Sequence, residues 1–314
     1  MLVRSVRPLV QATRFRVCCF VLALSATFVP LSAQQIAFTM DDLPAHGPLP
    51  PHTSRLEVAD AVTKALAEAG LPPTYGFVNG VRDQEQPDDV AVLDLWRKRG
   101  NPLGNHTWSH MDLNKNTAAA FEEDLAKNEP LLASKMEGAD WHWLRYPFLS
   151  EGNSPEKQAE VRRYLADHGY RIAGVTMSFG DYLWNDSYAR CMAKRDQAAI
   201  AFLEMSYLAS ARAEAEYELN ASRQVYGRAI PFVLLMHIGA FDARMLPRLL
   251  TQYKDMGFSF VTLEAAGADP FYAGDLKPAQ AAGPANLGAA ARLKGMTLSS
   301  APPPPPADLS LVCR

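Results

Sequence analysis

Short apolar runs alternate with amphipathic segments along most of the 314-residue chain, and this alternation constrains the fold more than any other feature. The runs have the length and composition of buried strands, and the segments between them carry helix signals such as the capping-box spacing from Ser54 to Glu57. This pattern predicts a parallel α/β barrel whose site lies at the carboxyl ends of the strands. Strands are expected over residues 36–40, 74–78, 101–105, 141–145, 171–175, 232–236 and 258–262, and helices over residues 54–70, 88–99, 117–136, 154–169 and 246–256.

Two adjacent carboxylates end the first of these strands. The apolar run stops at Asp41 and Asp42, and the period of two along a strand sends their side chains to different sides of the backbone. One acid would then bind a metal while the other takes a proton. Read alone, such a pair is more often a helix cap or a turn.

Two imidazoles four residues apart, His106 and His110, follow the third strand. With one carboxylate they make three nitrogen and oxygen ligands and leave a position open for water. That is the ligand set of a hydrolytic metal site. Two solvated or singly buried histidines are the alternative interpretation of the same pair.

Two further blocks, Arg145–Phe148 and Leu234–His237, stand at the ends of apolar runs. Together with Thr39–Leu43 and His106–His110, and in this order, they resemble the motifs of the polysaccharide deacetylase family, carbohydrate esterase family four. The family motifs are Thr-Phe-Asp-Asp-Gly, His-Ser/Thr-x-x-His, Arg-x-Pro-Tyr and, in effect, Leu-x-x-His. The resemblance covers roughly residues 35–265.

The resemblance implies a distorted, incomplete (β/α) barrel of about seven parallel strands, in a domain over residues 34–272. It also implies that Asp41 is the general base and that Asp42, His106 and His110 bind a divalent metal. Zn²⁺ is the expected ion, with Co²⁺ or Mn²⁺ as alternatives. The metal would acidify a bound water and polarise the carbonyl oxygen of an acetyl group, while Asp41 accepts the proton of the water.

The same resemblance implies three supporting roles. His237 would be the general acid that protonates the leaving amine or alcohol. Arg145 would orient Asp41. The backbone N–H of Phe148 would stabilise the negative charge on the former carbonyl oxygen.

The remaining motif residues are matched more loosely. Asp181 would pair with His237 or with Arg145. Pro147 and Trp184 are expected to contact the sugar, although a tryptophan in the core is an equal alternative for Trp184.

These residues favour a metal-dependent deacetylase that acts on an acetylated glycan, with peptidoglycan, chitin-like polymers and acetylated xylan all open as substrates. The same metal centre would also serve a deacylase or amidase of a small, non-carbohydrate amide. A catalytically silent glycan-binding protein is the third possibility. The joint presence of base, acid and metal ligands argues against it, because binding alone needs none of them.

Four arginines within the first sixteen residues precede an apolar run over residues 17–31, and small residues lead to Ala33. This pattern predicts a secretory signal peptide over residues 1–33 and an exported, periplasmic or extracellular protein with no stable membrane insertion. An uncleaved anchor is the less favoured alternative, since the run is shorter than the roughly 20 residues that span a membrane and contains Pro30.

Export would leave two cysteines, Cys191 and Cys313, which would either pair or leave a free, buried Cys191. The formal net charge of −3, with no basic cluster beyond the arginines of the signal, makes nucleic acid an unexpected partner. An acetylated glycan is the expected partner, and the sequence defines no oligomeric state.

Two stretches do not follow the alternation. A helical insertion is expected over residues 193–228, where apolar residues recur at steps of three and four, and packing on the outside of the barrel is favoured over a gating or partner-binding role. The Pro- and Ala-rich stretch over residues 273–314 is expected to be disordered or weakly ordered. His46 and His52 would be surface residues or substrate contacts, the surface being favoured.

Overall fold

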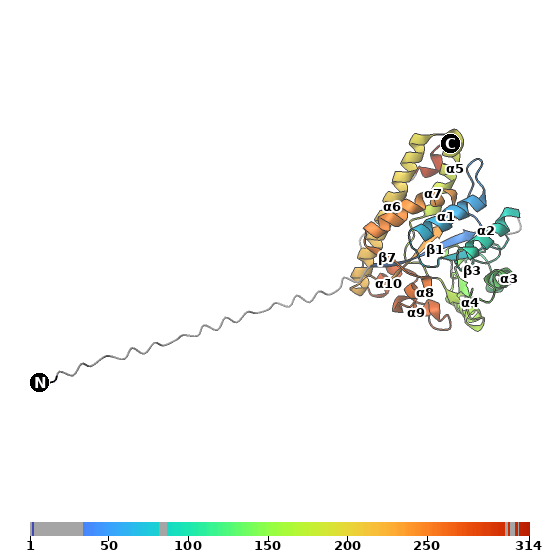
Figure 1. The fold of residues 1–314 in the computed structure, drawn as a ribbon. Coiled ribbons are helices and arrows are strands. Elements are labelled where there is room, and N and C mark those ends of the chain that lie inside the picture. Colours follow the sequence, from blue (N-terminus) through green and yellow to red (C-terminus); the bar gives the residue numbers. More distant parts are fainter. Residues whose placement is uncertain (1, 3–33, 82–86, 299–300, 302–304, 307) are drawn as a thin grey trace. The chain divides into compact units, whose positions relative to one another are not determined.

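The sheet is built around β1 (Gln34–Leu43), which pairs in parallel with β2, β6 and β7 (Figure 1). The computed structural model describes residues 2, 34–81, 87–298, 301, 305–306 and 308–314. The signal peptide predicted over residues 1–33 therefore lies outside the described residues, Leu2 excepted. Eight of the ten residues of β1 are buried.

Seven parallel strands form one sheet in the order β5-β4-β3-β2-β1-β6, with β7 also paired to β1. The predicted distorted (β/α) barrel of about seven parallel strands is thus confirmed. The strands after β1 are β2 (Tyr75–Val78), β3 (Leu103–Asn105), β4 (Trp143–Leu144), β5 (Arg171–Ile172), β6 (Phe232–His237) and β7 (Phe258–Phe260).

The segment after β5 curls the sheet back toward β6. The N–H groups of Thr176 and Met177 both donate to the carbonyl of Val233 at 3.1 Å, and the N–H of Leu235 donates to the carbonyl of Met177 at 3.1 Å. These three bonds link the two ends of the strand order without a further strand. The carboxyl ends of the parallel strands are thereby brought to one side of the barrel.

Helices connect the strands, and several begin at a side-chain cap. Ser54 and Glu57 form a capping box at the start of α1, Thr117 caps α3, and Ser154 followed by Pro155 opens α4. The longer helices are α1 (Arg55–Glu68), α2 (Pro87–Lys98), α3 (Ala118–Met136), α4 (Pro155–Asp167), α5 (Asn185–Lys194), α6 (Gln197–Tyr226) and α7 (Ala240–Asp255).

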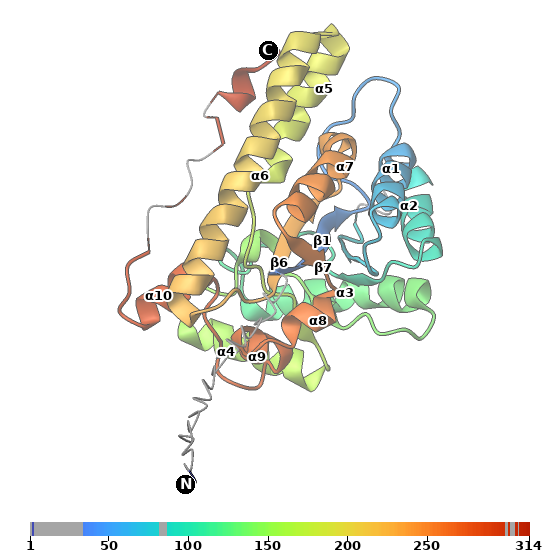
Figure 2. The ribbon, with the colours of Figure 1, turned by 60° about the vertical axis from the view of Figure 1, so that its left-hand side comes forward.

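The segment predicted as a helical insertion is a single 30-residue helix, α6, preceded by α5. Figure 2 shows α6 running alongside α5 and α7 on the outside of the barrel, as expected. Its buried face is the apolar stripe identified in the sequence, including Leu203, Tyr207 and Ala211. Burial of this stripe against the neighbouring helices holds α6 in place.

Helix α7 begins six residues before the expected start at residue 246, so that Pro247 lies inside it. A proline inside a helix removes one helical hydrogen bond. The additional turns bury Phe241 and Met245 completely, and this packing outweighs the local cost of the proline.

The stretch over residues 273–314 is not the disordered tail that its composition predicted. Its described residues include α9 (Ala273–Leu276), α10 (Leu287–Leu293) and a 3₁₀ turn at Leu309–Leu311. Helix α8 (Leu263–Gly267) lies before this stretch. Leu287 and Leu309 are buried in the main core, and Cys313 forms a disulfide with Cys191 of α5. The Pro- and Ala-rich composition predicts disorder, but these few buried side chains and the disulfide hold the segment against the core.

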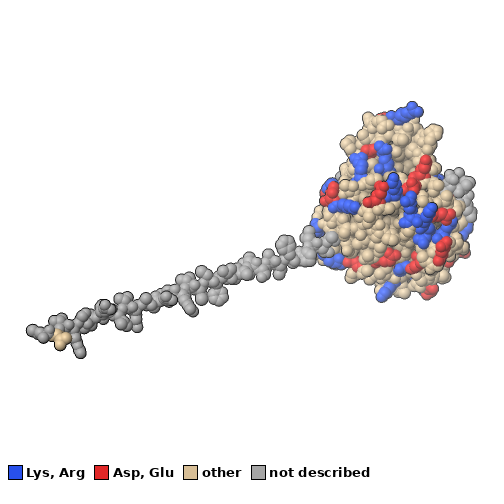
Figure 3. All heavy atoms as spheres, in the orientation of Figure 1, with Lys and Arg blue, Asp and Glu red and all other residues tan. Residues whose placement is uncertain are grey.

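The face in Figure 3 carries acidic and basic side chains that are interspersed. Among the described residues, no helix combines the length and the apolar character that are needed to cross a membrane.

Candidate active site

The four sequence blocks meet at the carboxyl ends of their strands. Asp41 on β1 lies in register with His237 on β6, and Asn105 at the end of β3 pairs with Leu144 of β4. The next residues along the chain, His106 and Arg145, therefore enter the same site. Parallel pairing thus brings together side chains that are far apart in the sequence.

The backbone turns at Asp42, and this changes the predicted alternation. Asp42 has φ of 65°, in the left-handed region, so it does not continue the extended conformation of β1. The two carboxylates approach the same imidazole, since His106 Nε2 lies 3.8 Å from Asp41 Oδ2 and 3.6 Å from Asp42 Oδ1. The alternation expected of a regular strand is therefore not kept at Asp42. The two acids still have different hydrogen-bond partners, as the sequence predicted: Arg145 for Asp41 and His46 for Asp42.

Asp42, His106 and His110 form a group whose ligand atoms suit a divalent metal. Asp42 Oδ1 lies 3.6 Å from His106 Nε2 and 3.5 Å from His110 Nε2. Two ligands that share a tetrahedral Zn²⁺ at its usual bond lengths stand about 3.4 Å apart, so these separations fit. Within the described residues, the buried Oδ1 of Asp42 accepts no hydrogen bond, as expected of an oxygen that binds a metal ion.

The protonation states of this group also suit a metal. Burial alone would raise the pKa of Asp42, but the His46 hydrogen bond and the charges of three other histidines hold that pKa well below its usual range. Burial lowers the pKa of His106 in spite of the nearby Asp41 and Asp42. The Nδ1 atom of His106 lies 2.7 Å from the carbonyl oxygen of Arg145, which leaves Nε2 for a metal.

Asp41 is held by a buried arginine. Arg145 Nη1 donates to both oxygens of Asp41, at 3.0 and 3.2 Å, and both side chains are almost completely buried. Arg145 is itself fixed, because its Nη2 donates to Thr39 Oγ1 at 3.0 Å and its Nε to the carbonyl of Ala173 at 2.8 Å. The guanidinium can therefore orient the carboxylate of Asp41 toward the metal ligands.

His237 is paired with Asp181, which settles the open choice between His237 and Arg145 as its partner. Asp181 Oδ1 lies 3.0 Å from His237 Nδ1, and its Oδ2 accepts the backbone N–H of His237 at 2.6 Å. Burial would lower the pKa of His237, but the charge and hydrogen bond of Asp181, with the charges of Asp42 and Asp41, raise it to about 9. A protonated imidazole therefore stands beside the carboxylates over a wide range of pH.

A 3₁₀ turn at Pro147–Leu149 forms one rim of the site. The N–H groups of Leu149 and Ser150 close this turn, and the N–H of Phe148 takes part in neither bond. The Phe148 ring is 64% exposed and lies 4.5 Å from the His110 ring, centroid to centroid. This N–H remains a candidate for the oxyanion contact.

Two residues predicted to contact sugar do not reach the surface. Pro147 is buried where it starts the 3₁₀ turn, so its ring shapes the backbone. Trp184 is fully buried beside Phe179 and Tyr207, and its Nε1 donates to Ser206 Oγ at 2.9 Å. The alternative of a core tryptophan is therefore the one observed for Trp184, and neither side chain is exposed for contact with a sugar.

Sequence reasoning missed the side chains that hold the loop after β3. Asp124 of α3 accepts the N–H of Ser109 at 2.9 Å, and Asn105 accepts that of Thr107 at the same distance. Asn79 donates to the carbonyl of His106 at 2.6 Å. The only local signal is that Asn105 directly precedes His106; the other contacts are long-range and follow no spacing rule.

Sequence reasoning also missed a second buried carboxyl group, Asp242, which lies near Asp181 and His237. Asp242 of α7 accepts hydrogen bonds from Tyr207 of α6 at 2.8 Å and from Asn185 at 2.7 Å. Burial and the charge of Asp181 raise the pKa of Asp242 well above its usual range. The long helix thus supports the site through one hydroxyl group, in addition to its apolar packing.

His46 is partly buried, and the favoured interpretation of it as a plain surface residue is therefore wrong. Its Nδ1 lies 2.6 Å from Asp42 Oδ2, and its side chain is only 22% exposed. His52 of the same loop is exposed, in agreement with the sequence interpretation.

Residues 29–173 match the family model described as polysaccharide deacetylase. A chitin deacetylase of Arthroderma benhamiae is 29% identical over 135 residues, which cover 42% of this chain and 33% of that protein. A chitin deacetylase of Pestalotiopsis sp. is 27% identical over 121 residues, which cover 38% of each. The chain thus matches about a third of the length of these relatives.

Solved structures of the same fold include one that is named a chitin deacetylase and one that is named a pseudoenzyme. The chitin deacetylase of Colletotrichum lindemuthianum has a TM-score of 0.50 at 19% identity, with 76% of this chain and 89% of that chain covered. A mutant of a CE4 family pseudoenzyme has a TM-score of 0.51 at 13% identity, with 75% of this chain and 68% of that chain covered. At such identities the likeness concerns the fold, and activity must be argued from the site.

Proposed function

Because the chain belongs to the polysaccharide deacetylase family, we propose that it hydrolyses the acetyl amide of an N-acetylglucosamine polymer, chitin-like or of the peptidoglycan type. One observation carries this proposal: a carboxylate fixed by arginine, a three-ligand metal group and a carboxylate-paired imidazole converge at one end of the barrel. Amide hydrolysis needs a base, an electrophile and an acid within one cleft.

Asp42, His106 and His110 would hold the divalent metal, with Zn²⁺ favoured over Co²⁺ and Mn²⁺ because two of the three ligands are imidazoles. When bound, this metal supplies an electrophile for the acetyl carbonyl and lowers the pKa of water. Burial of two of its three ligands strengthens the electrostatic interactions of the site.

The protein groups divide the proton transfers. Asp41 takes the proton of the attacking water, since Arg145 holds its carboxylate in place beside the ligand group. The N–H of Phe148 donates to the oxyanion of the tetrahedral intermediate. His237 gives its proton to the leaving nitrogen as the C–N bond breaks, so that acetate and a free amino group are released.

We also propose that residues 1–33 direct export and are removed. The disulfide between Cys191 and Cys313 supports this, because such bonds persist in oxidising compartments.

The direct test is acetate release by the purified protein, metal-free and Zn²⁺-loaded, from N-acetylglucosamine oligomers, peptidoglycan fragments, acetylated xylan and small acetamides. We expect metal-dependent release from the N-acetylated glycans. Release from small amides alone would favour a deacylase, and inactivity of the well-folded, metal-loaded protein would favour a silent glycan-binding protein.

Replacing Asp181 by Asn should narrow the pH range of activity from the alkaline side. Asp181 raises the pKa of His237 to about 9, and the protonated form is the one that acts as acid. Loss of its charge removes the largest of the effects that raise this pKa, so the alkaline limb of the kcat/KM profile should move down by at least about one pH unit. An unchanged limb would contradict the assignment of His237 as acid, and Asp60→Asn on the surface is the matched control.

A further inference from the structure

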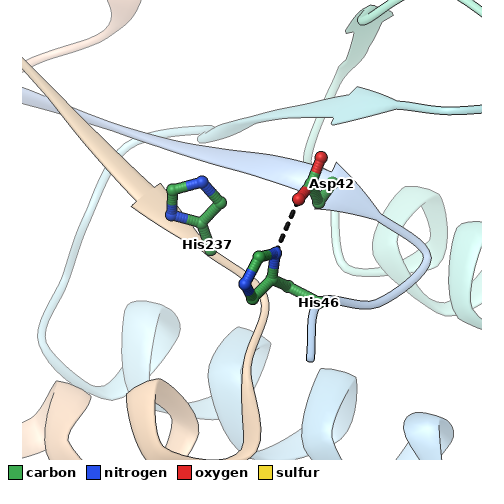
Figure 4. Close-up of side chains that lie close together, drawn as sticks. All are labelled: Asp42, His46 and His237. Carbon is green, nitrogen blue, oxygen red and sulfur yellow. Dashed lines mark hydrogen bonds and ion pairs between the residues drawn. The ribbon is translucent and has the colours of Figure 1, made fainter. Parts of the chain in front are cut away.

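His46 lies in the loop after β1 and faces Oδ2 of Asp42. Figure 4 shows its ring between the end of β1 and His237 at the end of β6, with Nδ1 directed at Asp42. The separation of 2.6 Å between Nδ1 and Asp42 Oδ2 is that of a short, charge-assisted hydrogen bond. The family motifs quoted above contain no residue at this position.

Distances decide whether His46 is itself a ligand. Asp42, His46 and His237 form a second group whose ligand atoms lie close together. A shared Zn²⁺ would need its bonds to two atoms 2.6 Å apart to meet at about 80°, far below the tetrahedral angle. The first group, with 3.5 and 3.6 Å separations, needs no such distortion. His46 therefore serves Asp42 by hydrogen bonding.

The two oxygens of Asp42 thus have separate tasks. Oδ1 faces the Nε2 atoms of His106 and His110, and Oδ2 faces Nδ1 of His46. A carboxylate whose second oxygen is bonded cannot turn freely about its own axis. The ligand oxygen is therefore oriented before the metal binds, and less conformational entropy is lost on binding.

The position of His46 is fixed independently of Asp42. Its backbone N–H donates to the carbonyl of Ile238 at 3.0 Å, which ties the loop to the end of β6. Its ring centroid lies 4.7 Å from that of His237 and 5.7 Å from that of Tyr182. A donor held in this way can impose an orientation on the carboxylate.

We propose that His46 is a positioning residue of the metal site, whose Nδ1–H holds Oδ2 of Asp42 so that Oδ1 stays directed at His106 and His110. This inference rests on the metal site of the proposed function. His46 lies outside the family motifs and was not predicted as a metal ligand, so it is an additional residue of this site.

The test measures Zn²⁺ affinity and stoichiometry by chelator competition on wild type, His46→Ala and His46→Asn, together with melting of the metal-free proteins. The Asn side-chain nitrogen, like Nδ1, is two bonds from Cβ and can donate to the same oxygen. We expect one Zn²⁺ per chain, a loss of affinity of about 10- to 100-fold in His46→Ala, and recovery to within a few-fold in His46→Asn. His52→Ala, which removes an exposed histidine of the same loop, should bind as wild type does.

Different outcomes separate the two proposals. Tight binding of one Zn²⁺ by both wild type and His46→Ala would overturn the role of His46 and leave the proposed function intact. Two Zn²⁺ per wild-type chain would overturn it as well, because His46 would then be a ligand. Failure of the wild type to bind Zn²⁺, Co²⁺ or Mn²⁺ would overturn both proposals.

Discussion

Asp41→Asn is expected to lower kcat/KM for acetate release by about 10²- to 10⁴-fold, the range that a general base contributes. The amide of Asn has nearly the shape of the carboxylate and can still accept one of the hydrogen bonds from Arg145, but it cannot take a proton from water. The metal ligands Asp42, His106 and His110 are unchanged, so Zn²⁺ content should remain that of the wild type. Steady-state kinetics and metal analysis of the same preparation check both statements.

The control for this variant is Asp60→Asn. Asp60 also pairs with an arginine, Arg99, at 2.8 Å, but both side chains are about half exposed. Its substitution should leave kcat/KM unchanged. Retention of more than a tenth of the activity by a folded, metal-loaded Asp41→Asn protein would contradict the role of Asp41 as base and would point to another proton acceptor.

The sequence predicts the centre of the site well because the strand ends converge in any parallel barrel. Asp41, His106 and His237 each follow a buried apolar run, and the register of β1 with its neighbours places them together. The geometry therefore needs little beyond the order of the strands. The chemical roles of these residues are still predictions, which the substitutions proposed here test.

The supporting residues are not predictable in the same way. Asp124, Asp242 and Tyr207 come from helices, where a polar residue on a buried face carries no periodic signal of its own. His46 follows a turn that begins at Asp42, and its position depends on the left-handed backbone there. Spacing rules describe regular elements, and these contacts depend on tertiary packing.

Composition also misleads where a few buried contacts outweigh it. The last 42 residues are rich in Pro, Ala and Gly, yet Leu287, Leu309 and the disulfide of Cys313 attach them to the core. Trp184 matched a family motif loosely, but its aromatic neighbours bury it. In both cases the deciding partners lie far away in the sequence.

Arg145→Met is expected to cost about 3–5 kcal/mol of unfolding free energy at neutral pH. Asp41 would remain as a buried carboxylate without its cation, and Thr39 and the carbonyl of Ala173 would each lose a donor. Methionine fills much of the space and keeps the contact with the Phe77 ring, over which the guanidinium lies at 4.8 Å. Denaturant titration of the metal-free proteins measures the loss without interference from ion binding.

A double-mutant cycle with Asp41→Asn separates the ion pair from the packing. The double variant buries no unpaired charge, so its loss of stability should be smaller than the sum of the two single losses. Arg99→Met, which breaks the exposed pair with Asp60, should cost less than about 1 kcal/mol. Equal costs for Arg145→Met and Arg99→Met would mean that water reaches Asp41 in the folded protein. The carboxylate would then be a solvated group, and the buried base on which the proposed mechanism depends would not exist.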